Sequence, residues 1–194
     1  MKRKLVYIIV LFLSVSPIFG QADFFDRLAD SALVLTKQRV RYDPAYVRID
    51  YPNGDVPPNK GVCTDVVIRA YRKMGIDLQK EVHEDMKANF SIYPKSWGLS
   101  GTDKNIDHRR VPNLMKFFSR HGTVKIMSKD HKDYLPGDIV CWNLRGGITH
   151  IGIVSNKKAL FVDRYKIIHN IGFGQVLEDC LFDFTIIGHY RYKK

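Results

Sequence analysis

The sequence predicts an α+β fold in which helices come first along the chain and strands follow. Apolar residues recur three or four positions apart over residues 22–39, 62–74, 78–90 and 111–121, which is the spacing of amphipathic helices. After Gly122 the pattern changes to short segments rich in β-branched and aromatic residues, separated by turn residues. Helices followed by consecutive strands are typical of an antiparallel sheet with helices packed on one side.

The second part of the chain predicts a sheet of about five to six strands. The segments that fit the strand pattern are 123–127, 138–142, 148–155, 159–163, 166–171 and 185–192. By contrast, residues 42–61 contain several prolines and no period, so we expect an ordered surface loop that leads into the second helix.

The N-terminus has the pattern of an export signal. Basic residues 2–4 precede an apolar run over 5–15, and residues 16–20 offer a cleavage point after Gly20. The apolar run is shorter than the roughly 20 residues that a membrane span needs. We therefore expect a signal peptide over residues 1–20 and a periplasmic or secreted protein, with an uncleaved anchor as the alternative. Residues 21–194 then form a single domain.

The chain is basic, with a formal net charge of +11 at pH 7. Loss of the three positive charges of the signal segment leaves +8, which attracts polyanions such as cell-wall polymers or anionic lipid surfaces. The charge is spread along the chain without a basic run or an aromatic-basic motif, so nucleic acid is not an expected partner. We also expect a monomer and no stable membrane insertion after signal cleavage.

Cys63 is the first candidate for chemistry, because it lies where the irregular segment turns into the second helix. The free N–H groups and the dipole at a helix start stabilise a thiolate, which makes Cys63 a candidate nucleophile. The alternative is a small buried apolar residue, as most free cysteines are. A nucleophilic cysteine needs a base, and His150 is a polar residue inside an otherwise apolar strand.

The next predicted strand carries His169 and Asn170, either of which could orient His150. Neighbouring residues of a strand point to opposite faces, so only one of the two side chains can reach the imidazole, and the alternation alone does not decide which. Gly152 lies on the same face as His150, where the missing side chain leaves room for a neighbouring strand.

These segments carry a resemblance to a known group of enzymes. A helix that starts at a cysteine is followed by residues 135–142 (Leu-Pro-Gly-Asp-Ile-Val-Cys-Trp), 149–154 (Thr-His-Ile-Gly-Ile-Val) and 167–169 (Ile-Ile-His). This arrangement resembles the NlpC/P60 superfamily of papain-like cysteine peptidases. More closely, residues 51–71, 106–114 and 169–172 resemble the bacterial DUF1287 family.

The resemblance implies a papain-like α+β fold and a catalytic triad. Cys63 would be the nucleophile, His150 the base and His169 the third residue, with Asn170 as the alternative third residue. The implied activity is that of a cysteine peptidase or amidase, a hydrolase that cleaves peptide bonds in the stem peptides of peptidoglycan. Two alternatives are a wall-binding module that keeps the fold without the activity, and an acyltransferase that uses the same triad.

Further residues are expected to bind substrate. Tyr51 lies twelve positions before Cys63, where many relatives place a tyrosine, and its phenol could bind the oxyanion together with the Cys63 N–H; the alternative is a turn tyrosine. Thr64 and Asp65 depart from the Asp-Cys-Ser-Gly motif of the superfamily and are expected to alter the local hydrogen bonding and the pocket.

Asp107 and Arg109 lie at the entry of a helix and are expected to bind a substrate carboxylate, with capping and surface charge as the alternative. No His-Glu-x-x-His or paired-cysteine pattern is present, so neither a metal nor a cofactor is expected. Cys141 and Cys180 each lie beside large apolar residues, and we expect two separate buried thiols rather than a disulfide.

Overall fold

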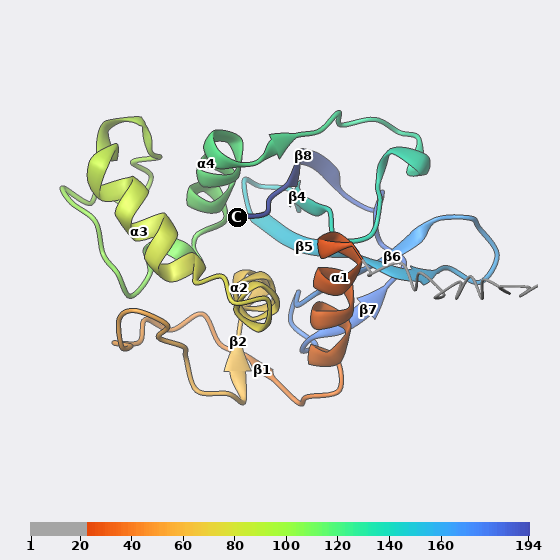
Figure 1. Ribbon diagram of the computed structural model, residues 1–194, viewed down its shortest axis with the longest axis horizontal. Helices are drawn as coiled ribbons and strands as arrows, with labels where there is room; N and C mark the ends of the chain where they lie inside the picture. The colour runs from red at the N-terminus through yellow and green to blue at the C-terminus, as the bar shows by residue number, and fades with distance from the viewer. Residues whose placement is uncertain (1–22) are drawn as a thin grey trace, which may run out of the picture.

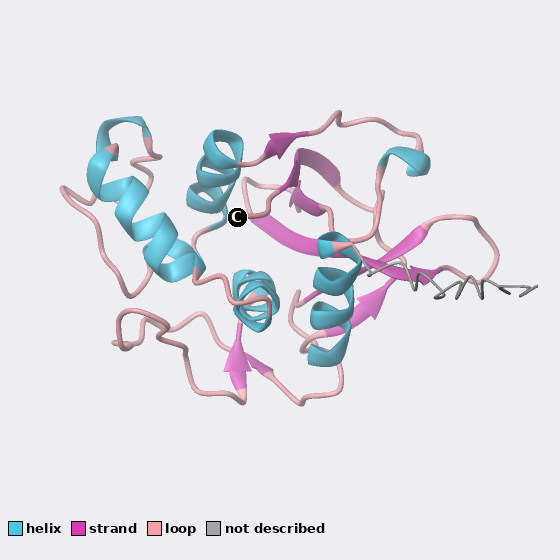
Figure 2. Ribbon diagram, in the orientation of Figure 1, coloured by secondary structure: helices cyan, strands magenta, loops and turns pink. Residues whose placement is uncertain are grey.

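The computed structural model describes residues 23–194, and the predicted signal peptide over residues 1–20 lies outside them. Within this range the chain forms four α-helices and a six-stranded antiparallel sheet, which confirms the predicted α+β class (Figure 1, Figure 2). Among the described residues, no helix is both long enough and apolar enough to cross a membrane.

The helices begin and end close to the predicted positions. They are α1 (Phe24–Leu35), α2 (Cys63–Lys73), α3 (Leu78–Ala88) and α4 (Val111–His121). Their boundaries follow from local signals: the Asp77 carboxylate accepts from the Gln79 N–H at 3.0 Å and caps α3. Gly75, just after α2, has φ +79, a value that glycine adopts without steric cost.

The main sheet has the strand order β3-β8-β4-β5-β6-β7, and neighbouring strands run antiparallel. Its strands are β3 (Thr123–Val124), β4 (Ile139–Asn143), β5 (Thr149–Lys158), β6 (Tyr165–His169), β7 (Val176–Glu178) and β8 (Thr185–Arg191). In this register Trp142 of β4 pairs with His150 of β5, so both side chains point to the same face of the sheet.

Two parts of the strand prediction are wrong. Residues 159–163 form the turn between β5 and β6 rather than a strand, and Leu160 and Phe161 are 85% and 96% exposed. The predicted surface loop contains a small parallel sheet, in which β1 (Arg41–Tyr42) pairs with β2 (Lys60–Gly61). This small sheet pairs Tyr42 with Gly61 and so fixes the loop beside the start of α2.

The sheet separates two apolar layers. Helices α1, α2 and α4 contact β5, while α3 packs against α2 and α4 (Figure 1). Ile139, Cys141, Ile151 and Ile153 face these helices in the main core. Alternate residues of the same strands, such as Val140 and Val154, belong to a second cluster on the other face. Both faces of β4 and β5 are therefore buried, which holds the central strands rigidly beside α2.

Candidate active site

Cys63 is the first residue of α2, and the chain that leads to it is fixed by two hydrogen bonds. The Val62 N–H donates to the Asp65 carboxylate at 2.7 Å, which closes the first turn of the helix. The Asn170 side-chain amide donates to the Gly61 carbonyl at 3.1 Å. The end of β6 therefore holds the residue that precedes the helix, and the position of the thiol depends on both elements.

The Cys63 thiol is protonated in the resting protein. Burial, together with the charge of Asp65, raises its pKa to about 12, although the backbone N–H groups of Ile151, Thr64 and Cys63 act in the opposite direction. The expectation of a thiolate stabilised by the helix start is therefore wrong for the protein without substrate. The physical reason is that burial destabilises the thiolate by more free energy than its interactions with three N–H groups stabilise it.

The N–H group of Ile151 connects Cys63 to His150. The sulfur lies against this backbone N–H, and His150 is the residue that comes directly before it in β5. At His150 and Ile151, one edge of β5 is paired with β4. Along the other edge of β5, pairing with β6 begins only at Ile153. Cys63 thus lies against β5 at the Ile151 backbone, and the base predicted from the sequence is the neighbouring residue along that strand.

His150, His169 and Glu178 form a chain of hydrogen bonds across three strands. Nε2 of His150 lies 2.8 Å from Nδ1 of His169, and Nε2 of His169 lies 3.0 Å from the Glu178 carboxylate. His169 is the closing residue of β6, and Glu178 lies diagonally across from it on β7, because Ile167 pairs with Glu178 in the register.

The chain of hydrogen bonds determines which nitrogen of each imidazole carries the proton. A carboxylate can only accept, so His169 donates from Nε2 to Glu178 and its Nδ1 is an acceptor. His150 then donates from Nε2 to that atom, which leaves the Nδ1 lone pair of His150 free. The hydrogen-bond network therefore presents an unprotonated nitrogen of a neutral imidazole as the base.

Both imidazoles are neutral at neutral pH. Burial, together with the neighbouring His169, lowers the pKa of His150 to about 3. Burial also lowers the pKa of His169, although the Glu178 carboxylate acts in the opposite direction. Cys63 and His150 are thus an uncharged acid and an uncharged base, rather than a preformed ion pair.

The structure brings His169, and not Asn170, to His150. Asn170 uses its amide for the Gly61 carbonyl and its carbonyl oxygen for the Gly172 N–H, which are both backbone contacts. Gly152 permits the approach of β6, as expected: a Cβ there would lie 2.8 Å from Ile167 Cγ2 and 3.1 Å from His169 Cβ. Such distances are shorter than normal carbon contacts.

The tyrosine near the start of α2 is Tyr42 and not Tyr51, because β1 pairs Tyr42 with Gly61. Burial and the charges of Cys63 and Asp65 raise the pKa of the Tyr42 phenol, and its side chain stays partly exposed. The ring of Tyr51 instead packs edge-on against His83 of α3 at 5.2 Å between ring centres. The expectation for Tyr51 is therefore corrected, because the loop turns it toward α3 while β1 brings Tyr42 to the start of α2.

The other predicted substrate-binding residues are engaged within the protein. Arg109 and Asp65 form a buried two-bond ion pair at 2.9 and 3.0 Å. The Thr64 hydroxyl donates to the Arg109 carbonyl at 3.1 Å, and Asp107 is 1% exposed. Thr64, Asp65 and Arg109 therefore contact one another at the start of α2, whereas the Asp107 carboxylate accepts from the Asp103 N–H and pairs with Arg110. A substrate contact of these four residues stays a prediction.

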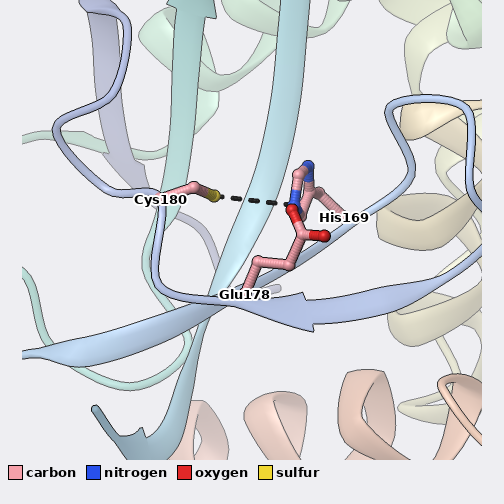
Figure 3. A group of neighbouring side chains, drawn as sticks. All are labelled: His169, Glu178 and Cys180. Atoms are coloured by element: carbon pink, nitrogen blue, oxygen red, sulfur yellow. Dashed lines mark hydrogen bonds and ion pairs between the residues drawn. The ribbon is translucent and has the colours of Figure 1, made fainter.

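Glu178 and Cys180 join the site without having been predicted there. Cys180 Sγ lies 3.5 Å from Nε2 of His169 (Figure 3), whereas His150 is bonded to the other ring nitrogen, Nδ1. Cys63, Cys141 and Cys180 are all free thiols, which confirms the absence of a Cys141–Cys180 disulfide. Strand β7 has only three residues and follows a run of glycines, so the sequence offered no periodicity from which to place Glu178.

The chain belongs to the DUF1287 family, a domain of unknown function whose pattern matches residues 29–192. This confirms the resemblance to the DUF1287 family. A relative in this group is the uncharacterized protein YijF of Escherichia coli (strain K12), which is 53% identical over 165 residues. The match covers 85% of this chain and 80% of the relative. No solved structure matches the chain.

Proposed function

We propose that this protein is an exported cysteine hydrolase with a papain-like fold of the NlpC/P60 type, acting on amide or peptide bonds in peptidoglycan stem peptides. The observation that carries the proposal is the chain of hydrogen bonds from Glu178 through His169 to His150, the residue that comes directly before Ile151, whose N–H lies against the Cys63 sulfur. Of the two nitrogens of His150, only Nε2 has a hydrogen-bonding partner among the described residues, so Nδ1 is available to take a proton.

The reaction begins with two neutral groups. As the Cys63 sulfur attacks the carbonyl carbon, Nδ1 of His150 takes the thiol proton, and His169 with Glu178 stabilises the imidazolium that forms. The developing oxyanion is bound by N–H groups at the start of α2 and by the Tyr42 phenol. His150 then gives its proton to the departing amine, which leaves a thioester on Cys63.

The second half regenerates the enzyme. Water loses a proton to Nδ1 of His150 as its oxygen attacks the thioester carbon, the carbon–sulfur bond breaks, and the proton returns to the Cys63 thiolate. Because the resting pKa of Cys63 is about 12 and that of His150 about 3, proton transfer accompanies attack rather than preceding it.

The predicted export signal and the basic charge support a cell-wall substrate. A net charge of +8 after signal removal favours adsorption to anionic wall polymers. On this proposal the protein works in the periplasm or outside the cell as a monomer. It needs no cofactor, nucleic acid or membrane insertion for the reaction.

A second candidate function is a non-catalytic wall-binding module on the same fold. The observations in its favour are that Cys63 is 7% exposed and protonated, and that a hollow of about 690 Å³ lies elsewhere. Asn143, Arg145, Phe182 and Thr185 are among its lining residues. An acyltransferase differs from the hydrolase only in the nucleophile, an amine in place of water, that resolves the thioester.

Digestion of purified sacculi followed by mass spectrometry of the released fragments tests the proposal and names the bond. We expect fragments from the wild-type protein and none from Cys63→Ala, while Cys141→Ala keeps the activity. Binding to sacculi without release by any variant supports the wall-binding module instead. Equal release by wild type and Cys63→Ala contradicts the nucleophile assignment.

A further inference from the structure

We propose that His169, Glu178 and Cys180 form a binding site for a zinc-type divalent metal ion, and that occupation of this site switches the proton position on His150. The site stands on its own geometry, whereas the switch rests on the proposed function of His150 as a base. The three side chains come from the end of β6, from β7 and from the turn after it, and they converge on one point (Figure 3).

The separations between the possible ligand atoms suit a tetrahedral ion. All three atoms lie within 4.8 Å of one another, with Nε2 of His169 at 3.5 Å from the sulfur and 3.0 Å from the carboxylate. Zinc bonds of about 2.3 Å to sulfur and about 2.0 Å to nitrogen, at the tetrahedral angle, separate those two atoms by about 3.5 Å. The imidazole and the thiol already have this separation, and movement of the carboxylate, which lies within 4.8 Å of the sulfur, completes the site.

The set of donor atoms selects the class of metal. One thiolate, one imidazole and one carboxylate favour Zn²⁺ and similar ions over Mg²⁺ and Ca²⁺, which prefer oxygen. His169 and Cys180 are buried, but the Glu178 side chain is 45% exposed and gives the ion a path from solvent. Water reaches the fourth position on the same side, as in zinc sites with three protein ligands.

Metal binding moves the proton of each of the two imidazoles from Nε2 to Nδ1. An ion on Nε2 of His169 displaces the proton there, so that His169 carries its single proton on Nδ1 and donates to Nε2 of His150. Neutral His150 must then carry its own proton on Nδ1, the nitrogen that acts as the base in the proposed mechanism. Each imidazole keeps one proton, and the proton of the Cys180 thiol is released to solvent.

The consequence is an inhibitory site. With its proton on Nδ1, neutral His150 has no lone pair to accept the Cys63 proton, so attack by the sulfur is blocked while the metal stays bound. The carboxylate that orients the base without metal becomes a ligand with metal. The same three residues therefore support two proton arrangements, one active and one inactive.

Cobalt titration of the purified, metal-free protein tests the site directly. We expect Co²⁺ to bind once per chain and to give the visible bands of a tetrahedral site together with a sulfur-to-cobalt charge-transfer band. Cys180→Ala should lose the charge-transfer band, and Cys141→Ala, the loss of another buried thiol, should keep it. Glu178→Gln, at a half-exposed position, should weaken binding without affecting folding.

Absence of the band in folded wild-type protein, or its persistence in Cys180→Ala, overturns the metal site. Nitrogen-15 NMR of the histidine rings tests the switch: addition of Zn²⁺ should move the His150 proton from Nε2 to Nδ1. An unchanged proton position with the metal bound overturns the switch. Neither measurement involves substrate, so a failure of the hydrolase proposal is distinguished from a failure of this one.

Discussion

Nε2 of His150 lies 2.8 Å from Nδ1 of His169, so one hydrogen bond joins the two buried imidazoles through an ε nitrogen of one ring and a δ nitrogen of the other. The second nitrogen of His169 faces a carboxylate, which sets the direction of that hydrogen bond. Because the pair is neutral, the direction decides whether Nδ1 of His150 carries a lone pair or a proton. On the proposed mechanism, Glu178 therefore controls the base from two strands away.

Tyr42 should contribute to turnover and Tyr51 should not. Tyr42→Phe removes a phenol beside Cys63 that could bind the oxyanion, and loss of one such donor typically lowers turnover about 10²–10³-fold. Tyr51→Phe is the matched control, since that ring packs on His83. Steady-state rates on stem peptides check this. A larger effect for Tyr51→Phe than for Tyr42→Phe contradicts the placement of both residues.

Gly152→Ala should destabilise the protein and separate the two histidines. The added carbon would meet Ile167, the Ile168 carbonyl and His169 at 2.8–3.1 Å, and overpacking of this kind costs about 1–3 kcal/mol. Gly101→Ala is the control, because nothing lies within 4 Å of a Cβ there. Urea unfolding measures both variants. Equal stability of the two proteins would show that β6 does not need the space at Gly152.

Asp65→Asn should cost about 3–5 kcal/mol in the free energy of unfolding, because it leaves the Arg109 guanidinium buried without its charge partner. It also weakens the bond that closes the first turn of α2. Asp163→Asn breaks an exposed ion pair with Lys158 and should leave stability unchanged. Chemical denaturation compares the two, and a similar small effect in both is inconsistent with a buried structural pair.

The free energy of unfolding should fall in mild acid. Burial lowers the pKa of His108 to about 3, with Arg109 and Arg72 acting in the same direction and Asp55 and Asp103 opposing them. Below about pH 6.5, His108 is therefore protonated in the unfolded chain but stays neutral in the folded chain. The free energy of unfolding falls as the pH is lowered from about 6.5 toward 3. For His108 alone the loss at pH 5 is about 2 kcal/mol.

Urea unfolding of wild type and His108→Gln at pH 7 and pH 5 measures this loss. The variant should show a shallower fall with pH, whereas the partly exposed His131→Gln should follow the wild type. An identical fall in wild type and His108→Gln would mean that His108 does not carry the effect.

The sequence predicted the helices well because their signals are local. Asp77 and Gly75 mark the boundaries of neighbouring helices through contacts within a few residues. The strands were less predictable: residues 159–162 are apolar, yet they belong to an exposed turn. Apolar composition indicates a strand only where a partner and a buried face exist, and neither is visible in the sequence.

At the site, the residue types were predictable and their states were not. Cys63, His150 and His169 stand out by motif, whereas Glu178 and Tyr42 reach the site through strands of three and two residues. The protonation of Cys63 depends on its burial, a tertiary property that outweighs the helix start. Arg109 looked like a surface ligand for carboxylates because its partner, Asp65, is distant in sequence.

Covalent labelling by an electrophilic analogue of a stem peptide tests the central claim most directly. The protein is incubated with the analogue, digested and mapped by mass spectrometry. We expect one label per chain on Cys63, abolished in His150→Ala and retained in Cys141→Ala. Labelling of Cys63 that is unaffected by His150→Ala, or equal labelling of Cys63, Cys141 and Cys180, would contradict the assignment of Cys63 and His150 as nucleophile and base.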